Sequence, residues 1–150
     1  ILKKSVLWIL DRVVIASALG AVFIRVGNFF NSEMIGKPSE EGFPLAVIFR
    51  QLDSIPRHPG QLYEAFGYVF VFLILFFLYW KTKKSMQTGF LFGLFLVLLM
   101  SVRVIVEQFK IAQIDSREDW ILGLNTGQVL SIPFVLCGLY FMFLYKPKTN

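Results

Sequence analysis

Residues 65–80 read AFGYVFVFLILFFLYW, and no side chain in this run is charged. The runs 85–102 and 120–145 share this property. About 20 apolar residues suffice to cross the hydrocarbon core of a bilayer, so each run predicts a transmembrane helix. The third run is too long for one span and begins with several polar and glycine residues. We therefore expect its helix to begin near Thr126 or Gly127.

A fourth predicted span covers residues 11–30 and is less uniform. Asp11 and Arg12 lie at one end of it, and Arg25 lies near the other. The whole chain is 56% hydrophobic and 17% charged, with a mean hydropathy of +0.65. These values are typical of a polytopic membrane protein. The sequence thus predicts an all-α bundle of about four transmembrane helices, in a single integral membrane domain over residues 1–150.

The charge and cysteine content narrow the possible functions. The formal net charge of +5 fits loops beside an anionic leaflet, and no basic stripe indicates nucleic-acid binding. The single cysteine, Cys137, excludes an internal disulfide framework, and we expect it to be a small buried apolar residue. One histidine and scattered carboxylates provide no ligand spacing for a metal, and we expect no cofactor.

Lysines in the short connections predict the orientation in the membrane. The turn 81–88 contains three lysines, and Lys146 and Lys148 follow the last span. Both segments therefore read as cytoplasmic, because positively charged loops are retained on that side. Four crossings then place the loop 37–60 and the segment 109–124 on the outer side.

Several ionisable side chains fall within or beside the apolar runs, at the ends predicted to face outward. They are Arg25, Glu33, His58, Glu64, Arg103, Glu107 and Lys110. Charge at this depth is costly, and its convergence from three helices favours a functional site. Arg103 and Glu107 are four residues apart on one helical face, so mutual neutralisation of this pair is an alternative. Arginine matches phosphate through two parallel hydrogen bonds, which points to an anionic lipid headgroup.

Three sequence motifs resemble those of one enzyme family. Residues 25–36 read RVGNFFNSEMIG, residues 57–65 read RHPGQLYEA, and SVRVIVEQFK at 101–110 is followed by NTGQVLSIP at 125–133. Their residues and their order resemble the signature, the second conserved box and the closing helices of the bacterial prolipoprotein diacylglyceryl transferases. The resemblance covers nearly all of the 150 residues.

The resemblance implies a seven-helix enzyme of the bacterial inner (cytoplasmic) membrane. Its site would open toward the outer leaflet, and its carboxyl terminus would be cytoplasmic. Members of the family transfer the diacylglyceryl group of phosphatidylglycerol to the lipobox cysteine thiol of prolipoproteins, the first step of lipoprotein maturation, and glycerol phosphate leaves. The implied partners are phosphatidylglycerol, a prolipoprotein signal peptide with its lipobox cysteine, and the bilayer, with no nucleic acid.

The resemblance also assigns site residues. Those expected to be catalytic are Arg25, Arg103, Glu33 and His58. Those expected to bind substrate are Arg25, Asn28, Asn31, Gly36, Gln61, Tyr63, Glu64, Arg103 and Glu107. The two arginines would stabilise the departing phosphate, where negative charge builds up. The base that removes the thiol proton stays open between His58 and Glu33, because the family places a further histidine in its amino-terminal half.

The chain departs from the family pattern in two places. Gly60 replaces a usual serine, and Lys110 replaces a usual arginine, which removes a bidentate donor. The proline-aspartate pair that usually follows is also missing, and Asp115 or Asp119 would have to substitute for the aspartate.

Two further expectations concern the extent and the class of the protein. The motifs begin just before the signature helix, so we expect about three amino-terminal helices outside residues 1–150. These residues alone should then be inactive. A polytopic transporter or channel fragment and a non-catalytic, anionic-lipid-binding membrane protein are the rival functions. A transporter function would not explain the asparagine-rich signature motif.

The predicted orientation can be tested by cysteine labelling in intact cells, with Cys137 replaced by serine. A membrane-impermeant reagent should label Glu41→Cys from outside and should leave Lys83→Cys unmodified, because the lysine-rich turn is expected inside. Labelling of Lys83→Cys without Glu41→Cys would invert the topology.

Overall fold

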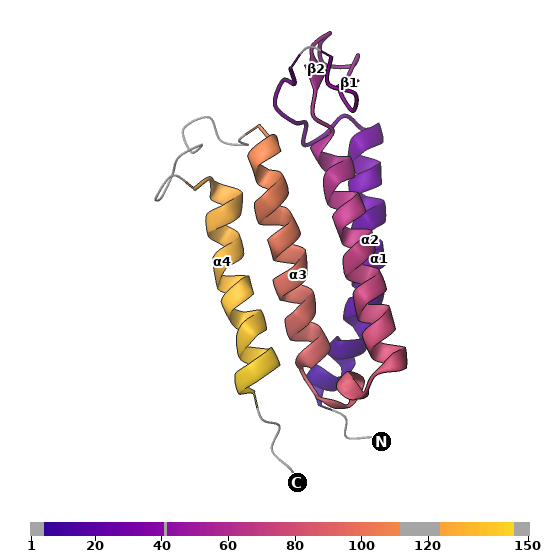
Figure 1. Ribbon diagram of the computed structural model, residues 1–150, viewed down its shortest axis with the longest axis vertical. Coiled ribbons are helices and arrows are strands. Elements are labelled where there is room, and N and C mark those ends of the chain that lie inside the picture. Colours follow the sequence, from indigo (N-terminus) through magenta and orange to yellow (C-terminus); the bar gives the residue numbers. More distant parts are fainter. Residues whose placement is uncertain (1–4, 41, 112–123, 146–150) are drawn as a thin grey trace.

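Four long helices dominate the computed structural model, which describes residues 5–40, 42–111 and 124–145 (Figure 1). They are α1 (Val6–Phe30), α2 (Gly60–Lys81), α3 (Phe90–Val106) and α4 (Thr126–Leu139). The shorter elements are strands β1 (Val47–Ile48) and β2 (Pro56–Arg57), 3₁₀ turns Lys83–Met86 and Glu107–Phe109, and a π-helical turn, Tyr140–Leu144. The strands lie over one end of α1 and α2, here called the sheet end, and Lys83–Met86 marks the opposite, turn end.

All four predicted spans are present as helices long and apolar enough to cross a membrane. The all-α prediction is confirmed, and the chain forms part of a multi-pass membrane protein. The predicted start of the fourth helix at Thr126 is also confirmed. Asn125 caps it, since its side chain accepts from the amide of Gln128 while the Gln128 side chain binds the Asn125 amide in return.

The uncharged run 85–102 begins before its helix does, whereas the predicted helical placement of Arg103 and Glu107 beyond this run agrees with the span Phe90–Phe109. Residues 83–86 form a 3₁₀ turn, and α3 begins at Phe90, after Gly89 with a φ of 90°. The carboxylate of Asp11 fixes this start. It accepts hydrogen bonds from the amides of Gly89 and Phe92 over 2.6 and 2.8 Å, and it is only 1% exposed. An acidic residue of α1 thus caps a helix far away in sequence.

The apolar core lies between α1, α2 and α3. Its buried members are Val14, Ala18, Val71, Leu75, Phe90 and Leu91. Large apolar side chains on the outer faces stay exposed, as expected where a helix meets lipid rather than water. Cys137 on α4 is among the exposed residues, so the expectation that it is buried is wrong. The apolar run around it faces outward.

Helices α3 and α4 approach closely where two glycines meet. A Cβ atom at Gly93 would lie 2.5 Å from the carbonyl oxygen of Gly138, and one at Gly138 would lie 2.6 Å from that of Gly93. Small residues let helix backbones pack closely in membranes, where burial of apolar surface contributes little. This contact aligns the two helices that carry the third motif.

The loop predicted over residues 37–60 folds as a small antiparallel sheet. Val47 pairs with Arg57 and Ile48 with Pro56. An isolated bridge also joins Pro38 to Arg57. The sequence analysis did not anticipate these strands, which are too short to show an alternating pattern.

Replacing Gly93 with alanine should separate α3 from α4, because the new methyl group would meet backbone that cannot move aside. We expect the full-length protein in detergent to lose about 1–3 kcal/mol of unfolding free energy. Gly20→Ala is the matched control. Its Cβ meets nothing within 4 Å, so its stability should stay within about 1 kcal/mol of the parent or rise. Equal stability of both variants would contradict the close crossing.

Candidate functional site

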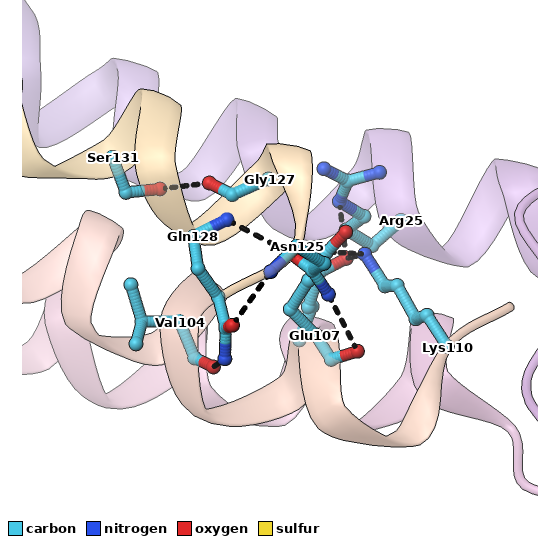
Figure 2. Close-up of polar contacts among 9 residues, drawn as sticks. Arg25, Val104, Glu107, Lys110, Asn125, Gly127, Gln128 and Ser131 are labelled. Atoms are coloured by element: carbon cyan, nitrogen blue, oxygen red, sulfur yellow. Dashed lines mark hydrogen bonds and ion pairs between the residues drawn. The ribbon is translucent and has the colours of Figure 1, made fainter. Parts of the chain in front are cut away.

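A buried carboxylate joins three elements at the sheet end. The side chain of Glu64, near the start of α2, is 0% exposed. Its Oε2 atom lies 2.9 Å from Nε of Arg25 on α1 and 2.8 Å from Nζ of Lys110, just after α3. Figure 2 shows the Arg25 and Lys110 side chains reaching this point from different parts of the chain. The predicted convergence of charges at one end of the bundle is present.

Arg103, in the last turn of α3, differs from Arg25 in its pairing. Its Nε atom is buried and finds no hydrogen-bond partner within the part of the chain that the structure describes. The nearby hydroxyl of Tyr68, which is 2% exposed, interacts electrostatically with Arg25, Glu64 and Arg103. Nε of Arg103 is therefore without a hydrogen-bond partner among the described residues, whereas Nε of Arg25 pairs with Glu64.

Glu107 contacts Lys110 and the start of α4. Its Oε2 lies 3.8 Å from Nζ of Lys110, and the Asn125 side chain donates to its carbonyl oxygen over 3.4 Å. A Cβ atom at Gly127 would lie 2.5 Å from the Glu107 carboxyl carbon, so glycine leaves space for the carboxylate there. Among the described residues the ion-pair partner of Glu107 is Lys110. The alternative of an isolated Arg103–Glu107 pair is not observed.

Helix α4 is attached to α3 by amide side chains. The Gln128 side chain donates to the carbonyl of Val104 over 3.3 Å, and Ser131 donates to the carbonyl of Gly127 over 2.7 Å (Figure 2). The Gln128 contact, with that from Asn125 to the Glu107 carbonyl, holds the start of α4 beside the end of α3, and the Ser131 hydrogen bond lies within α4. Asn125 and Gln128 were not predicted to support the site, although both belong to the third motif.

The turn after α1, residues 31–36 of the signature motif, is here called the signature turn. Two of its residues have an unusual backbone conformation. Ser32 and Met34 have φ values of 55° and 56°, which are uncommon for residues other than glycine. The Gln61 side chain, 0% exposed, donates to the carbonyl of Glu33 over 2.5 Å and holds the turn against α2. The Glu33 side chain is exposed, as is that of Asn31 at the end of α1. Strained backbone of this kind is often found at functional sites.

Gly36 brings the signature turn against two other segments. It forms a bridge with Lys110, and a Cβ atom on it would collide with the carbonyl of His58 and lie 2.9 Å from that of Phe109. No other residue type leaves room for this approach. Asn28 lies near the end of α1. With its amide turned so that nitrogen donates to the Ile24 carbonyl, its oxygen accepts from Nη1 of Arg25 over 3.2 Å.

His58 lies among aromatic rings just before α2. Its Nδ1 atom is 3.2 Å from the hydroxyl of Tyr63, and its ring centroid is 4.7 Å from that of Phe43 and 5.4 Å from that of Phe109. The imidazole is partly buried. His58 and Tyr63 thus form a hydrogen-bonded pair, distinct from the ion pairs around Glu64.

The small sheet of β1 and β2 carries its own ion pair. Arg57 donates to the Asp53 carboxylate over 2.6 Å and to the Gly36 carbonyl over 3.4 Å. The hydrogen bond from Arg57 holds the pKa of Asp53 below its usual range. This pair connects strand β2 to the signature turn.

An apolar cavity of about 610 Å³ opens beside Tyr63, between the outer loop and α2. Pro44, Leu45, Leu62 and Phe66 contribute to its lining. Its chemistry suits a hydrocarbon chain or an apolar side chain. Within residues 5–40, 42–111 and 124–145, no three potential metal ligands come together.

Comparison with known proteins assigns the family. Residues 1–144 match the family model described as prolipoprotein diacylglyceryl transferase. The chain belongs to that family. It is 47% identical over 142 residues to the phosphatidylglycerol–prolipoprotein diacylglyceryl transferase of Tolumonas auensis, covering 95% of this chain and 53% of the relative. It is 42% identical over 148 residues to the protein of the same name from Bacteroides fragilis, covering 99% and 52%. The chain therefore spans about half the length of these relatives.

Several of the ionisable residues singled out in the sequence lie together at the sheet end. Arg25 and Lys110 each contact Glu64, Glu107 joins them through Lys110, and Gly36 supports the turn beside them. Tyr68 belongs to the same cluster and was missed, although it follows Gln61 and Glu64 on one face of α2. Asp115 and Asp119, proposed as substitutes for the missing aspartate, lie outside the described residues.

Proposed function

We propose that the full-length protein transfers the diacylglyceryl group of phosphatidylglycerol to the lipobox cysteine of a prolipoprotein. The observation that carries this proposal is the buried Nε atom of the partly buried Arg103, which has no hydrogen-bond partner in the described chain, near the ion pairs of Arg25, Glu64 and Lys110. A guanidinium group with a buried, unpartnered donor is suited to an anionic group. The names of the relatives supply the identity of that group, a phosphatidylglycerol headgroup.

The reaction would proceed by displacement at the glycerol carbon. The thiol loses its proton, the sulfur–carbon bond forms, and the carbon–oxygen bond to phosphate breaks. The electron pair of that bond stays on the departing glycerol phosphate. Arg103 and Arg25 would contact the phosphate and stabilise the added negative charge in the transition state. Asn28 would orient Arg25 through the 3.2 Å contact to Nη1.

The general base remains a choice between two residues of this chain. His58 is the better candidate, because in the tautomer whose Nδ1–H donates to the Tyr63 hydroxyl its Nε2 would be free to accept the thiol proton. Glu33 is exposed and belongs to the signature turn, so its carboxylate is accessible to a peptide. Asn31, Gly36 and Gln61 would shape the turn that the substrates meet.

The location follows from the same proposal. Residues 1–150 would form the carboxyl-terminal part of a single seven-helix domain in the bacterial inner membrane. The sheet end would face the outer leaflet, where the signal peptide is presented, and the turn end with its lysines would face the cytoplasm. The apolar cavity beside Tyr63 would then lie at headgroup depth.

A protein with either rival function would use the same arginines but would not carry out this reaction. A transporter would move a substrate without covalent change, and a lipid-binding scaffold would hold phosphatidylglycerol without turnover. Transfer of radiolabelled diacylglyceryl from phosphatidylglycerol to a lipobox peptide, by the purified full-length protein in liposomes, separates the enzyme from both. Lipid binding without transfer would reject the proposal.

The two arginines give a sharper test in the same assay. Arg25→Lys and Arg103→Lys keep the charge but lose the planar fork, so each should lower kcat/KM by about 100-fold or more. Arg50→Lys is the control, because Arg50 is exposed on the outer loop and should keep its activity. Near-normal turnover of both test variants would exclude bidentate phosphate binding by these residues.

Residues 1–150 alone should not catalyse the transfer. Without the rest of the domain, the faces that carry Arg25, Glu33 and Arg103 would meet lipid, where unpaired polar groups cost several kcal/mol each. The assay is repeated with this chain alone and with the amino-terminal half of a relative co-expressed. Robust transfer by the chain alone would show that the other helices are dispensable.

A further inference from the structure

The charges around Glu64 sum to a small positive value. The cluster contains the cations Arg25, Arg103 and Lys110 and the carboxylates Glu64 and Glu107, so its described members carry a net charge of +1 by this count. The neighbouring Arg57–Asp53 pair is neutral and outside the helices. Glu33 and Lys37 are exposed at the surface. Among the residues that the structure describes, the cations of this cluster therefore exceed its carboxylates by one charge.

We propose that Glu64 is the counter-ion that limits this excess to one charge, and thereby permits the phosphate product to leave. The inference rests on the proposed function. A phosphodiester such as phosphatidylglycerol carries one negative charge and matches the cluster. The product, glycerol phosphate, carries two at pH 8, because the second pKa of a phosphate monoester is about 6. The excess charge of the site thus matches the substrate and not the product.

The charge balance of the reaction explains why such a limit is useful. The monoanionic diester enters, the thiol proton departs, and the carbon–oxygen bond breaks with its electron pair on the phosphate. The leaving group therefore becomes a dianion inside a site of low dielectric constant. A larger positive charge would hold this dianion more tightly than the substrate, and release of the product would become slow.

The position of Glu64 fits a counter-ion better than a substrate contact. Its side chain is 0% exposed, and one oxygen, Oε2, is shared by Arg25 and Lys110 at 2.9 and 2.8 Å. A carboxylate facing the phosphate directly would repel it. Glu64 acts instead through the two cations, so it is a positioning residue rather than a catalytic one.

Three variants vary the charge of the cluster with little change of shape. Glu64→Gln raises the net charge to +2, and Lys110→Gln lowers it to 0. The double variant Glu64→Gln with Lys110→Gln returns it to +1. Glu40→Gln is the matched control, because Glu40 is an exposed loop carboxylate and its loss changes the total charge equally. All four are made in the full-length protein, with size-exclusion chromatography as the check of folding.

The measured quantity is the ratio of two inhibition constants at pH 8. One inhibitor is glycerol phosphate, the dianion, and the other is glycerophosphoglycerol, the monoanionic diester of the deacylated headgroup. A dianion gains twice the electrostatic free energy of a monoanion from an added charge. Glu64→Gln should therefore shift the ratio by about tenfold or more toward the dianion. Lys110→Gln should shift it in the opposite direction, and the double variant should restore the parental ratio.

The outcomes separate this inference from the proposed function. Transfer by the parent protein tests the function alone. If the parent is active but the ratio does not follow the net charge, or the double variant does not recover it, the counter-ion role is overturned. If Glu64→Gln does not fold, two other results still test the counter-ion role. They are the opposite shift of the ratio in Lys110→Gln and the reversal of that shift in the double variant. A shift of equal size in Glu40→Gln would assign the effect to total charge and overturn the proposal.

Discussion

The Glu64 carboxylate is the interaction on which the sheet end depends. It is fully buried, and its Oε2 atom binds a cation from α1 and a cation from the end of α3. An unpaired charge at this depth would cost several kcal/mol, so each partner requires the others. These ion pairs fix the position of α1 along α2, and they fix the path of the chain after α3. The signature turn is then held between these elements by Gly36 and Gln61.

A different constraint governs the packing of the helices. Lipid surrounds the bundle, so burial of apolar surface gives little preference for one helix neighbour over another. Specificity comes from close backbone contacts and from polar groups that need a partner. Gly93 and Gly138 provide the first between α3 and α4. Asp11 provides the second at the turn end, where it caps α3 from α1. The two ends of the bundle are thus aligned by buried carboxylates, Asp11 at one and Glu64 at the other.

The sequence predicts the helices well because the signal is local. Long uncharged runs mark three of the four spans, the span over residues 11–30 is recognised despite its charged residues, and polar and glycine residues at the beginning of the last run indicate the start of α4. The start of α3 is missed because its cap, Asp11, lies far away in sequence and reads as a marker of a helix end. The ion pairs are missed for the same reason. Spacing along one helix indicates Arg103 with Glu107, whereas the folded chain brings Lys110 to Glu107 and to Glu64. The residue types at Ser32 and Met34 do not indicate the strained turn, because neither serine nor methionine favours a positive φ.

The two departures from the family pattern, Gly60 and Lys110, are in contact. A Cβ atom at Gly60 would lie 3.2 Å from Cγ of Lys110, so a serine there would press against the aliphatic part of the lysine. Nζ of this lysine reaches Glu64 over 2.8 Å along that path. Glycine therefore leaves room for the route that lysine takes to the shared carboxylate. Lysine supplies a point charge without the fork of arginine, which is sufficient for a counter-ion of Glu64 but not for bidentate phosphate binding. Under the proposed function, the position after α3 consequently contributes charge to the site, and the phosphate contacts would be left to the two arginines.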